Sequence, residues 1–316
     1  MNKIKILITT TSFQDTPGNH HSLLKKQDWD IDYLRGPITS NILLPIIGLY
    51  DGVICGDDEY NSTVLNAGSL GKLKILSKYG VGLDKIDLET ANKLNIIVTN
   101  CPGVNQISVA EHALALLLTF EKNIHLQYNS VQNLSWERLI GNEINNSLLG
   151  IIGMGSVGKE LAKKAIAFGM RVHAYDINID NDFKLKFPSI EFTSNIDDIY
   201  HKSNVISLHL PHNKVTHHMI NNDVIFNKLK NHPIIINTSR GNLIDVDPLI
   251  KGLNENVIRG YLTDVLSDEP IKNSEKLVGI NNVIITPHVG SRTFQSVERQ
   301  GSKAINNMLN KLNQYI

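Results

Sequence analysis

Three polar side chains in the last third of the chain, Arg240, Glu269 and His288, have the chemistry needed to oxidise a hydroxyl-bearing carbon or to reduce the corresponding carbonyl. An imidazole with an unperturbed pKa of about 6.5 can take the hydroxyl proton as hydride leaves the same carbon, and a positioned base contributes about 10²–10⁴-fold in rate. Glu269 at the other ring nitrogen would orient the ring and stabilise the imidazolium. Arg240 can hold a carboxylate through paired N–H donors and polarise a carbonyl in the reverse direction. We therefore predict hydride transfer on a small 2-hydroxy or 2-keto acid.

Each of these residues also has an ordinary explanation. Arg240 could be a surface charge, Glu269 a solvated loop acid and His288 a core histidine with satisfied hydrogen bonds. However, each follows an expected strand, and these strands lie at 233–238, 260–263 and 282–286. Because parallel strands in a doubly wound sheet point their carboxyl ends at one ligand crevice, the joint placement favours a shared catalytic site.

A glycine-rich turn predicts where a dinucleotide binds. An apolar run at 148–152 stops at Gly153, Gly155 and Gly158, and a helical apolar pattern follows to about residue 169. Gly153 permits a sharp turn, Gly155 lets the backbone approach a pyrophosphate, and Gly158 lets the helix pack closely on the strand. The free N–H groups and the dipole of a helix N-terminus favour an anion at this place.

Asp176 indicates which dinucleotide binds. It ends the next strand, 171–175, and lies 18 residues beyond Gly158. A carboxylate there can accept hydrogen bonds from both ribose hydroxyls and would repel a 2′-phosphate. Ile177 and Asn178 add no cation that could bind such a phosphate. We predict NAD as the cofactor.

Length and charge narrow the class of protein. The chain has 316 residues, enough for two ordinary domains, and equal numbers of basic and acidic residues, 31 each. This balance gives no bulk attraction to nucleic acid or to an anionic membrane. There is no run of about 18 apolar residues, no signal-peptide pattern at the N-terminus, and no metal-type cysteine or histidine spacing. We expect a cytoplasmic protein without a metal, nucleic-acid or membrane partner.

Strand-like and helix-like stretches alternate along the chain on both sides of the glycine turn. The predicted fold class is α/β, with two Rossmann-like or flavodoxin-like doubly wound parallel-sheet domains separated by an active-site cleft. Residues 1–100 and 288–316 are expected to form a discontinuous substrate-binding, catalytic domain. Residues 101–287 are expected to form the NAD-binding domain.

The stretch from 107 to about 125 predicts a helix that is apolar on more than one face. Such a helix is buried either within its domain or by another subunit. Trp136 and a polar stretch to residue 146 follow it, in the position of a projecting arm. We expect a homodimer.

Taken together, these motifs resemble the D-isomer-specific 2-hydroxyacid dehydrogenase family, and within it phosphoglycerate-dehydrogenase-like members without a regulatory domain. The resemblance rests on the segments 79–84, 100–103, 108–112, 153–158, 209–211, 237–241, 264–270 and 286–288. It implies that Arg240, Glu269 and His288 are the catalytic residues. It also implies a dimer formed through residues 104–147 and domain closure over the cleft.

The resemblance further implies binding residues. The substrate carboxylate would meet the backbone amides of Val81 and Gly82, with Arg240 and His288, and Asp264 would meet the nicotinamide carboxamide. Besides the three glycines and Asp176, the implied cofactor contacts are Ser156, Val157, His209, Pro211, Thr216, Thr238, Ser239, Arg240, His288 and Gly290.

The substrate stays open between several acids. Lys78 occupies a place suited to a substrate phosphate, but the acids at 57–59 would oppose a phosphate if they faced the cleft. Phosphoglycerate is therefore one possibility, and a specialised 2-keto acid such as a phosphonate is another. A non-catalytic NAD(H)-sensing protein, similar to the family's corepressor branch, is the alternative function.

Overall fold

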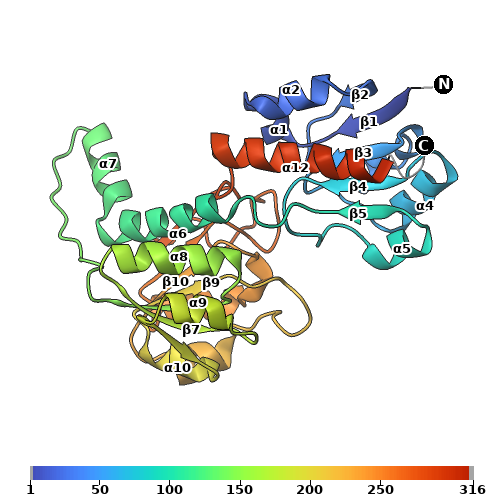
Figure 1. The fold of residues 1–316 in the computed structure, drawn as a ribbon. Helices are drawn as coiled ribbons and strands as arrows, with labels where there is room; N and C mark the ends of the chain where they lie inside the picture. The colour runs from blue at the N-terminus through green and yellow to red at the C-terminus, as the bar shows by residue number, and fades with distance from the viewer. Residues whose placement is uncertain (1–2, 313–316) are drawn as a thin grey trace. The chain divides into compact units, whose positions relative to one another are not determined.

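A computed structural model describes residues 3–312 of the chain. The chain forms two compact units: unit 1 comprises residues 1–105 and 291–316, and unit 2 comprises residues 106–290. Each unit is built on its own parallel sheet, with helices packed against both faces (Figure 1). The predicted class of two doubly wound parallel-sheet domains is confirmed.

Unit 1 has a five-stranded sheet in the order β2-β1-β3-β4-β5. Its strands are β1 (Ile4–Ile8), β2 (Trp29–Tyr33), β3 (Gly52–Cys55), β4 (Ile75–Lys78) and β5 (Ile97–Thr99). The helices α1 (Thr11–Asp15), α2 (Asn19–Lys25) and α12 (Phe294–Leu312) pack on one face. The opposite face is covered by α3 (Ser40–Leu43), η1 (Ile47–Leu49), α4 (Ser62–Leu70) and α5 (Leu88–Lys93). Alternation along β1 explains the two layers, since Ile6 and Ile8 face α12 whereas Leu7 faces α4.

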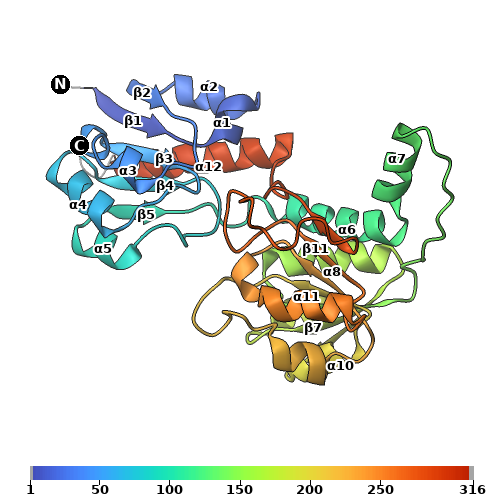
Figure 2. The ribbon, with the colours of Figure 1, turned by 180° about the vertical axis from the view of Figure 1, so that it is seen from behind.

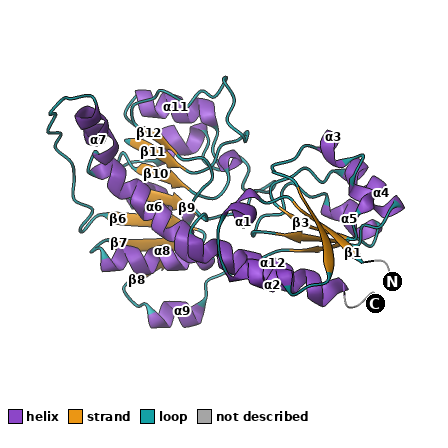
Figure 3. Ribbon diagram, turned by 90° about the horizontal axis from the view of Figure 1, so that it is seen from above, coloured by secondary structure: helices purple, strands orange, loops and turns teal. Residues whose placement is uncertain are grey.

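Unit 2 has a seven-stranded sheet in the order β12-β11-β10-β9-β6-β7-β8 (Figure 3). Its strands are β6 (Leu148–Ile152), β7 (Arg171–Tyr175), β8 (Ile190–Thr193), β9 (Val205–Leu208), β10 (Ile234–Asn237), β11 (Gly260–Thr263) and β12 (Val283–Ile285). Most are buried on both faces, which explains their continuous apolar runs.

The helices of unit 2 form two layers around this sheet. One layer contains α6 (Gln106–Glu121), α8 (Ser156–Ala167) and α9 (Asn181–Lys186). The other contains α10 (Ile196–Lys202), the π-helix η2 (Val224–Lys228), the 3₁₀ turn η3 (Gly241–Leu243) and α11 (Val246–Asn254) (Figure 2). No helix within residues 3–312 combines the length and the apolar character needed to cross a membrane.

The strand order of unit 2 reverses between β6 and β9. From β6 the chain moves outward through β7 and β8, and then returns to β9 and continues in the opposite direction. The turn after β6 and the end of β9 touch closely, because a Cβ on Gly153 would lie 2.4 Å from the carbonyl oxygen of His209. In open α/β sheets such a switch point is where ligands bind.

The expected single helix over 107–125 is interrupted. It ends as α6 at Glu121, Asn123 takes a left-handed conformation (φ +52°), and α7 (Ile124–Gln132) begins beyond it. No residue of α7 is buried. This helix and the segment that follows it extend away from the sheet of unit 2, and the chain then returns to the core at the buried Ile144 (Figure 1).

Candidate active site

The glycine turn in unit 2 is shaped for a closely approaching ligand. Gly153 has φ +100°, and a Cβ on Gly158 would lie 2.1 Å from the carbonyl oxygen of Gly153. Both positions therefore require glycine. By contrast, no atom beyond the chain neighbours of Gly155 lies within 4 Å of the place its Cβ would occupy. This open space is at the N-terminus of α8, whose first residue is Ser156, and it fits a pyrophosphate.

Asp176 lies directly after β7 and is hydrogen-bonded to the glycine turn. Its Oδ2 accepts the N–H of Met154 at 2.6 Å, and its Oδ1 accepts the N–H of Asn178 at 2.8 Å. Each carboxylate oxygen has more than one lone pair, so these bonds are compatible with acceptance of ribose hydroxyls. The structure thus places the carboxylate against the glycine turn that follows β6.

The loops after β9 and β10 place several predicted cofactor contacts near one another. Ser239 Oγ donates to the carbonyl of Leu208 at 3.0 Å, which ties the end of β10 to that of β9. Thr216 Oγ1 donates to the carbonyl of Pro211 at 2.7 Å and closes the loop after β9. Thr238 Oγ1 is buried and has no hydrogen-bond partner among the described residues. A buried hydroxyl in this state is suited to bonding a bound molecule.

His209, at the end of β9, is held in its neutral form. Its Nε2 lies 2.8 Å from Ser207 Oγ, and burial lowers the pKa of His209 to about 4. The ring is therefore uncharged at pH 7. A neutral ring beside the turn of Gly153 can donate or accept a hydrogen bond without adding a charge.

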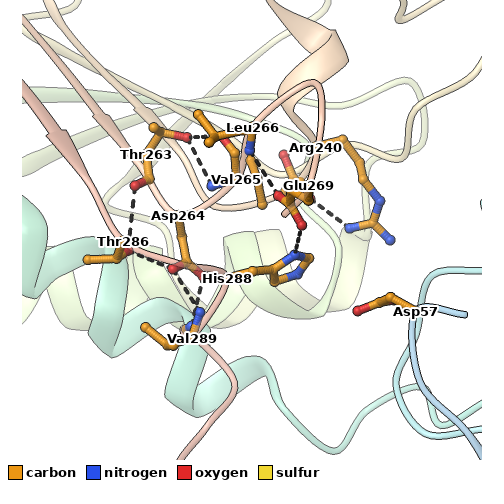
Figure 4. A network of polar contacts seen from close by, with 12 residues as sticks. Asp57, Arg240, Thr263, Asp264, Val265, Leu266, Glu269, Thr286, His288 and Val289 are labelled. Atoms are coloured by element: carbon orange, nitrogen blue, oxygen red, sulfur yellow. Dashed lines mark hydrogen bonds and ion pairs between the residues drawn. The ribbon is translucent and has the colours of Figure 1, made fainter. Parts of the chain in front are cut away.

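Asp264 is the buried anchor of the turn that carries His288. It is 2% exposed and accepts hydrogen bonds from Thr286 Oγ1 (2.6 Å) and from the N–H groups of Val289 (2.9 Å) and Gly290 (2.7 Å) (Figure 4). Burial alone would raise the pKa of Asp264, but the hydrogen bonds from His112, Thr286 and the two amides outweigh it and the pKa is lowered. The carboxylate is thus ionised and fixes residues 286–290.

His112 of α6 completes this network. Its Nε2 lies 2.8 Å from Thr286 Oγ1 and 3.4 Å from Asp264 Oδ1. Because Thr286 donates its hydrogen to Asp264, Nε2 of His112 is the donor to Thr286. Neither His112 nor Thr286 was predicted to have a role in the site. They are 174 residues apart, and no local pattern joins them.

His288 and Glu269 form a direct pair. His288 Nδ1 lies 2.7 Å from Glu269 Oε2, and Glu269 Oε1 accepts the N–H of Leu266 at 2.9 Å. The backbone of His288 is left-handed (φ +53°), and its N–H donates to the carbonyl of Asp264 at 2.9 Å. With Nδ1–H donated to the carboxylate, the neutral ring carries its lone pair on Nε2. This is the tautomer that a proton acceptor needs.

Arg240 comes from the neighbouring strand end and faces the same side (Figure 4). It follows β10, which pairs with β11, and its backbone carbonyl accepts Asn237 Nδ2 at 2.8 Å. A Cβ on Gly241 would lie 2.1 Å from the carbonyl carbon of Leu266, so glycine is required for the Arg240 segment to pack against the loop that carries Glu269. The structure therefore brings Arg240, Glu269 and His288 to the adjacent ends of β10, β11 and β12.

In unit 1, the residues assigned to the substrate lie at the end of β4 and in the loop after it. Lys78 is buried, and its Nζ donates to the carbonyl of Gly56 at 2.6 Å and to Asp57 Oδ1 at 2.5 Å. Val81 is exposed, and its carbonyl accepts Asn100 Nδ2 at 2.8 Å. Gly80 has φ +132°, which lets the chain turn sharply before Val81 and Gly82.

A dinucleotide-binding sheet whose strand ends carry an arginine and a histidine–glutamate pair is the arrangement of a nicotinamide-dependent dehydrogenase. Residues 114–290 match the family described as D-isomer specific 2-hydroxyacid dehydrogenase, NAD binding domain. The chain belongs to this family. It is an NAD-dependent oxidoreductase that acts on the CH–OH group of 2-hydroxy acids. The predictions of family, cofactor and reaction class are confirmed.

The matches to similar proteins extend over most of the chain. It is 32% identical to the glyoxylate reductase of Thermofilum pendens, over 90% of this chain and 83% of that protein. It is 34% identical to the D-3-phosphoglycerate dehydrogenase of Synechocystis over 86% of this chain, and spans 48% of that protein's length. The crystal structure of the TT0316 protein from Thermus thermophilus is similar with a TM-score of 0.87 and 30% identity, over 98% of this chain and 97% of that one.

Proposed function

We propose that the protein is a 2-keto acid reductase in which His288 is the acid and base, Glu269 orients it and Arg240 binds the substrate carboxylate. The observation that carries this proposal is the 2.7 Å contact between His288 Nδ1 and Glu269 Oε2. It sets the ring tautomer and holds a compensating charge where an imidazolium forms.

The proton steps follow from this contact. NAD, when bound, supplies the hydride chemistry at C2 of the substrate. During reduction, protonated His288 gives its Nε2 proton to the carbonyl oxygen. During oxidation the neutral ring takes the hydroxyl proton at the same nitrogen, and Glu269 stabilises the resulting charge. Arg240 offers its fork of N–H donors to the carboxylate, and Val81 and Gly82 of unit 1 offer backbone N–H groups.

Unit 2 holds the cofactor in this proposal. The helix N-terminus at Ser156 and Val157 faces the pyrophosphate, and Asp176 accepts the ribose hydroxyls. The buried hydroxyl of Thr238 and the neutral ring of His209 supply uncharged polar contacts. The remaining contacts come from Pro211, Thr216, Ser239, Asp264 and Gly290.

An NADH-depletion screen tests the function. The panel contains glyoxylate, hydroxypyruvate, pyruvate, phosphohydroxypyruvate, phosphonopyruvate and branched 2-keto acids, since related proteins are named for glyoxylate and phosphoglycerate. We expect turnover of at least one member with NADH. Tight NADH binding without turnover of any member, together with capture of a protein partner, would instead support the sensor function.

We also propose that two copies pair through α7 and the segment 133–147. This region exposes large apolar side chains: Leu134 is 98%, Trp136 80% and Ile140 95% exposed. An apolar surface of this kind is typical of an interface. The returning segment is anchored at its base, where the buried carboxylate of Glu121 accepts hydrogen bonds from Asn142 and Arg259. In this proposal, a second copy of the chain covers these exposed apolar side chains.

We further propose that the protein works in the cytoplasm. Both cysteines, Cys55 and Cys101, are unpaired thiols and buried. Free thiols are typical of a reducing compartment.

A further inference from the structure

The loop 56–59 lies at the switch point of the unit 1 sheet. The strand order β2-β1-β3-β4-β5 reverses between β1 and β3, and this loop follows β3. A Cβ on Gly56 would lie 3.3 Å from Thr10, which follows β1. In sheets of this order, ligands bind outside the carboxyl ends of the strands at that point. The side chains of this loop are therefore placed to choose among substrates.

The three acidic side chains of the loop contact different groups. Asp58 is fully buried and accepts hydrogen bonds from Thr9 Oγ1 and from the N–H of Ile38 (2.9 Å). Burial raises the pKa of Asp58, against the opposing effect of these hydrogen bonds. Glu59 accepts the N–H of Ser40 at 3.1 Å, at the start of α3. Asp57 alone of the three contacts Lys78 in the described structure.

Lys78 is bound to this loop. Its side chain is 6% exposed, whereas that of Asp57 is 65% exposed, and their charged atoms lie 2.5 Å apart. The stem of Lys78 passes 3.8 Å from the place a Cβ would take on Gly80, in the loop that leads to Val81 and Gly82. A buried ammonium needs a counter-charge, and Asp57 provides it. The positive charge that suited a substrate phosphate is thus already neutralised.

We propose that Asp57 is a specificity-determining residue that makes the enzyme select 2-keto acids with an uncharged substituent and disfavour phosphorylated ones. This inference rests on the proposed reductase function. A phosphate could reach Lys78 only by displacing Asp57, and the displaced carboxylate would then repel the phosphate dianion. A hydroxyl or a hydrogen at the same position of the substrate meets no such repulsion.

The wild-type enzyme gives the first test. With NADH, we expect kcat/KM for hydroxypyruvate to exceed that for 3-phosphohydroxypyruvate by at least about tenfold, since the pair differs only by the phosphate. Equal or better use of the phosphorylated acid would overturn the inference and leave the reductase function intact. Failure to reduce either acid, or any other 2-keto acid, would overturn both.

Asp57→Asn gives the second test. The amide oxygen can still accept a hydrogen bond from Lys78, but the carboxylate charge is lost. We expect the ratio of the two kcat/KM values to move toward the phosphorylated acid by at least about tenfold. Glu59→Gln is the matched control, because it removes one negative charge from the same loop without touching Lys78, and its ratio should stay at the wild-type value.

An equal shift in both variants would show a general charge effect and overturn the assignment to Asp57. An unchanged ratio in Asp57→Asn would do the same. If Asp57→Asn is recovered unfolded, the wild-type ratio can still overturn the inference.

Discussion

His288 and Glu269 lie with Nδ1 and Oε2 2.7 Å apart, and both are fixed from behind. The N–H of Leu266 holds the other oxygen of Glu269 at 2.9 Å, and the carbonyl of Asp264 holds the N–H of His288, also at 2.9 Å. Leu266 and Asp264 follow β11, whereas His288 follows β12. Two neighbouring strand ends therefore place the pair, and the catalytic geometry depends on the sheet rather than on one flexible loop.

His288→Asn should lower kcat/KM by about 10²–10⁴-fold, the usual contribution of a positioned acid or base. NADH binding, followed by fluorescence titration, should change little, because the ring sits at the substrate end of the proposed site. His201→Asn, on the exposed side of α10, is the control and should keep wild-type activity. Near-wild-type turnover in purified His288→Asn would remove His288 from the proposed mechanism.

Thr286→Val tests the anchor beneath the catalytic pair. The variant keeps the side-chain shape but removes the hydroxyl that donates to Asp264 at 2.6 Å and lies 2.8 Å from His112. Asp264 keeps the N–H groups of Val289 and Gly290, but the loss of the two hydrogen bonds of Thr286 should lower the free energy of unfolding by about 1–3 kcal/mol. We also expect kcat to fall while the KM for NADH stays close to wild type, because Thr286 acts by positioning His288. Urea unfolding and steady-state kinetics check the two effects, and an unchanged kcat would limit Thr286 to a structural role.

Asp176→Ala tests the choice of cofactor. Removing the carboxylate should raise kcat/KM with NADPH relative to NADH by at least about tenfold, since the 2′-phosphate no longer meets a negative charge. Activity with NADH should also fall, because the hydrogen bond from Met154 is lost. Asp182→Ala, an exposed acid at the start of α9, should leave the ratio unchanged. A wild-type enzyme that prefers NADPH would contradict the assigned role of Asp176.

Trp136→Glu tests the proposed dimer. A charge in place of this exposed apolar side chain should convert the protein from dimer to monomer in size-exclusion chromatography with light scattering. Leu70→Glu is the control, because Leu70 is 90% exposed at the end of α4 in unit 1 and should leave the mass unchanged. A monomeric wild-type protein at micromolar concentration would contradict the proposed dimer.

The sequence predicts best where the structural signal is local. The kind of element and its first and last residues could be predicted for the glycine turn and for the strands β7 and β11. Buried parallel strands appear in the sequence as short apolar runs between turn residues. The strands β2 and β8 carry a weaker signal. Each of these strands pairs with a neighbour on one side only. In Trp29–Tyr33 and Ile190–Thr193, apolar residues alternate with acidic or polar ones. An edge strand with exposed positions lacks the continuous apolar run.

Contacts between distant segments could not be predicted from spacing. The strand ends identify Arg240, Glu269 and His288 as neighbours, because adjacent strands share one sheet edge. The support from His112 depends on how α6 packs across the sheet, which no local pattern specifies. Likewise, the acids at 57–59 look equivalent in sequence, and only the backbone of the loop turns Asp58 inward and Asp57 toward Lys78.

His209 makes stability depend on pH in a defined direction. Burial lowers the pKa of His209 to about 4, whereas an unfolded histidine titrates at about 6.5. As the pH falls between these values, the unfolded chain binds the proton before the folded chain does, so the free energy of unfolding decreases. One such proton changes the free energy of unfolding by at most about 1.4 kcal/mol per pH unit. Above the pKa of the unfolded histidine, the free energy of unfolding no longer depends on this proton. Burial also lowers the pKa of His20 and of His173.

Urea unfolding at several pH values should therefore show stability lost between about pH 6.5 and 4, and the loss should be smaller in His209→Gln. Equal slopes in the two proteins would mean that His209 is protonated in the folded state as readily as in the unfolded chain.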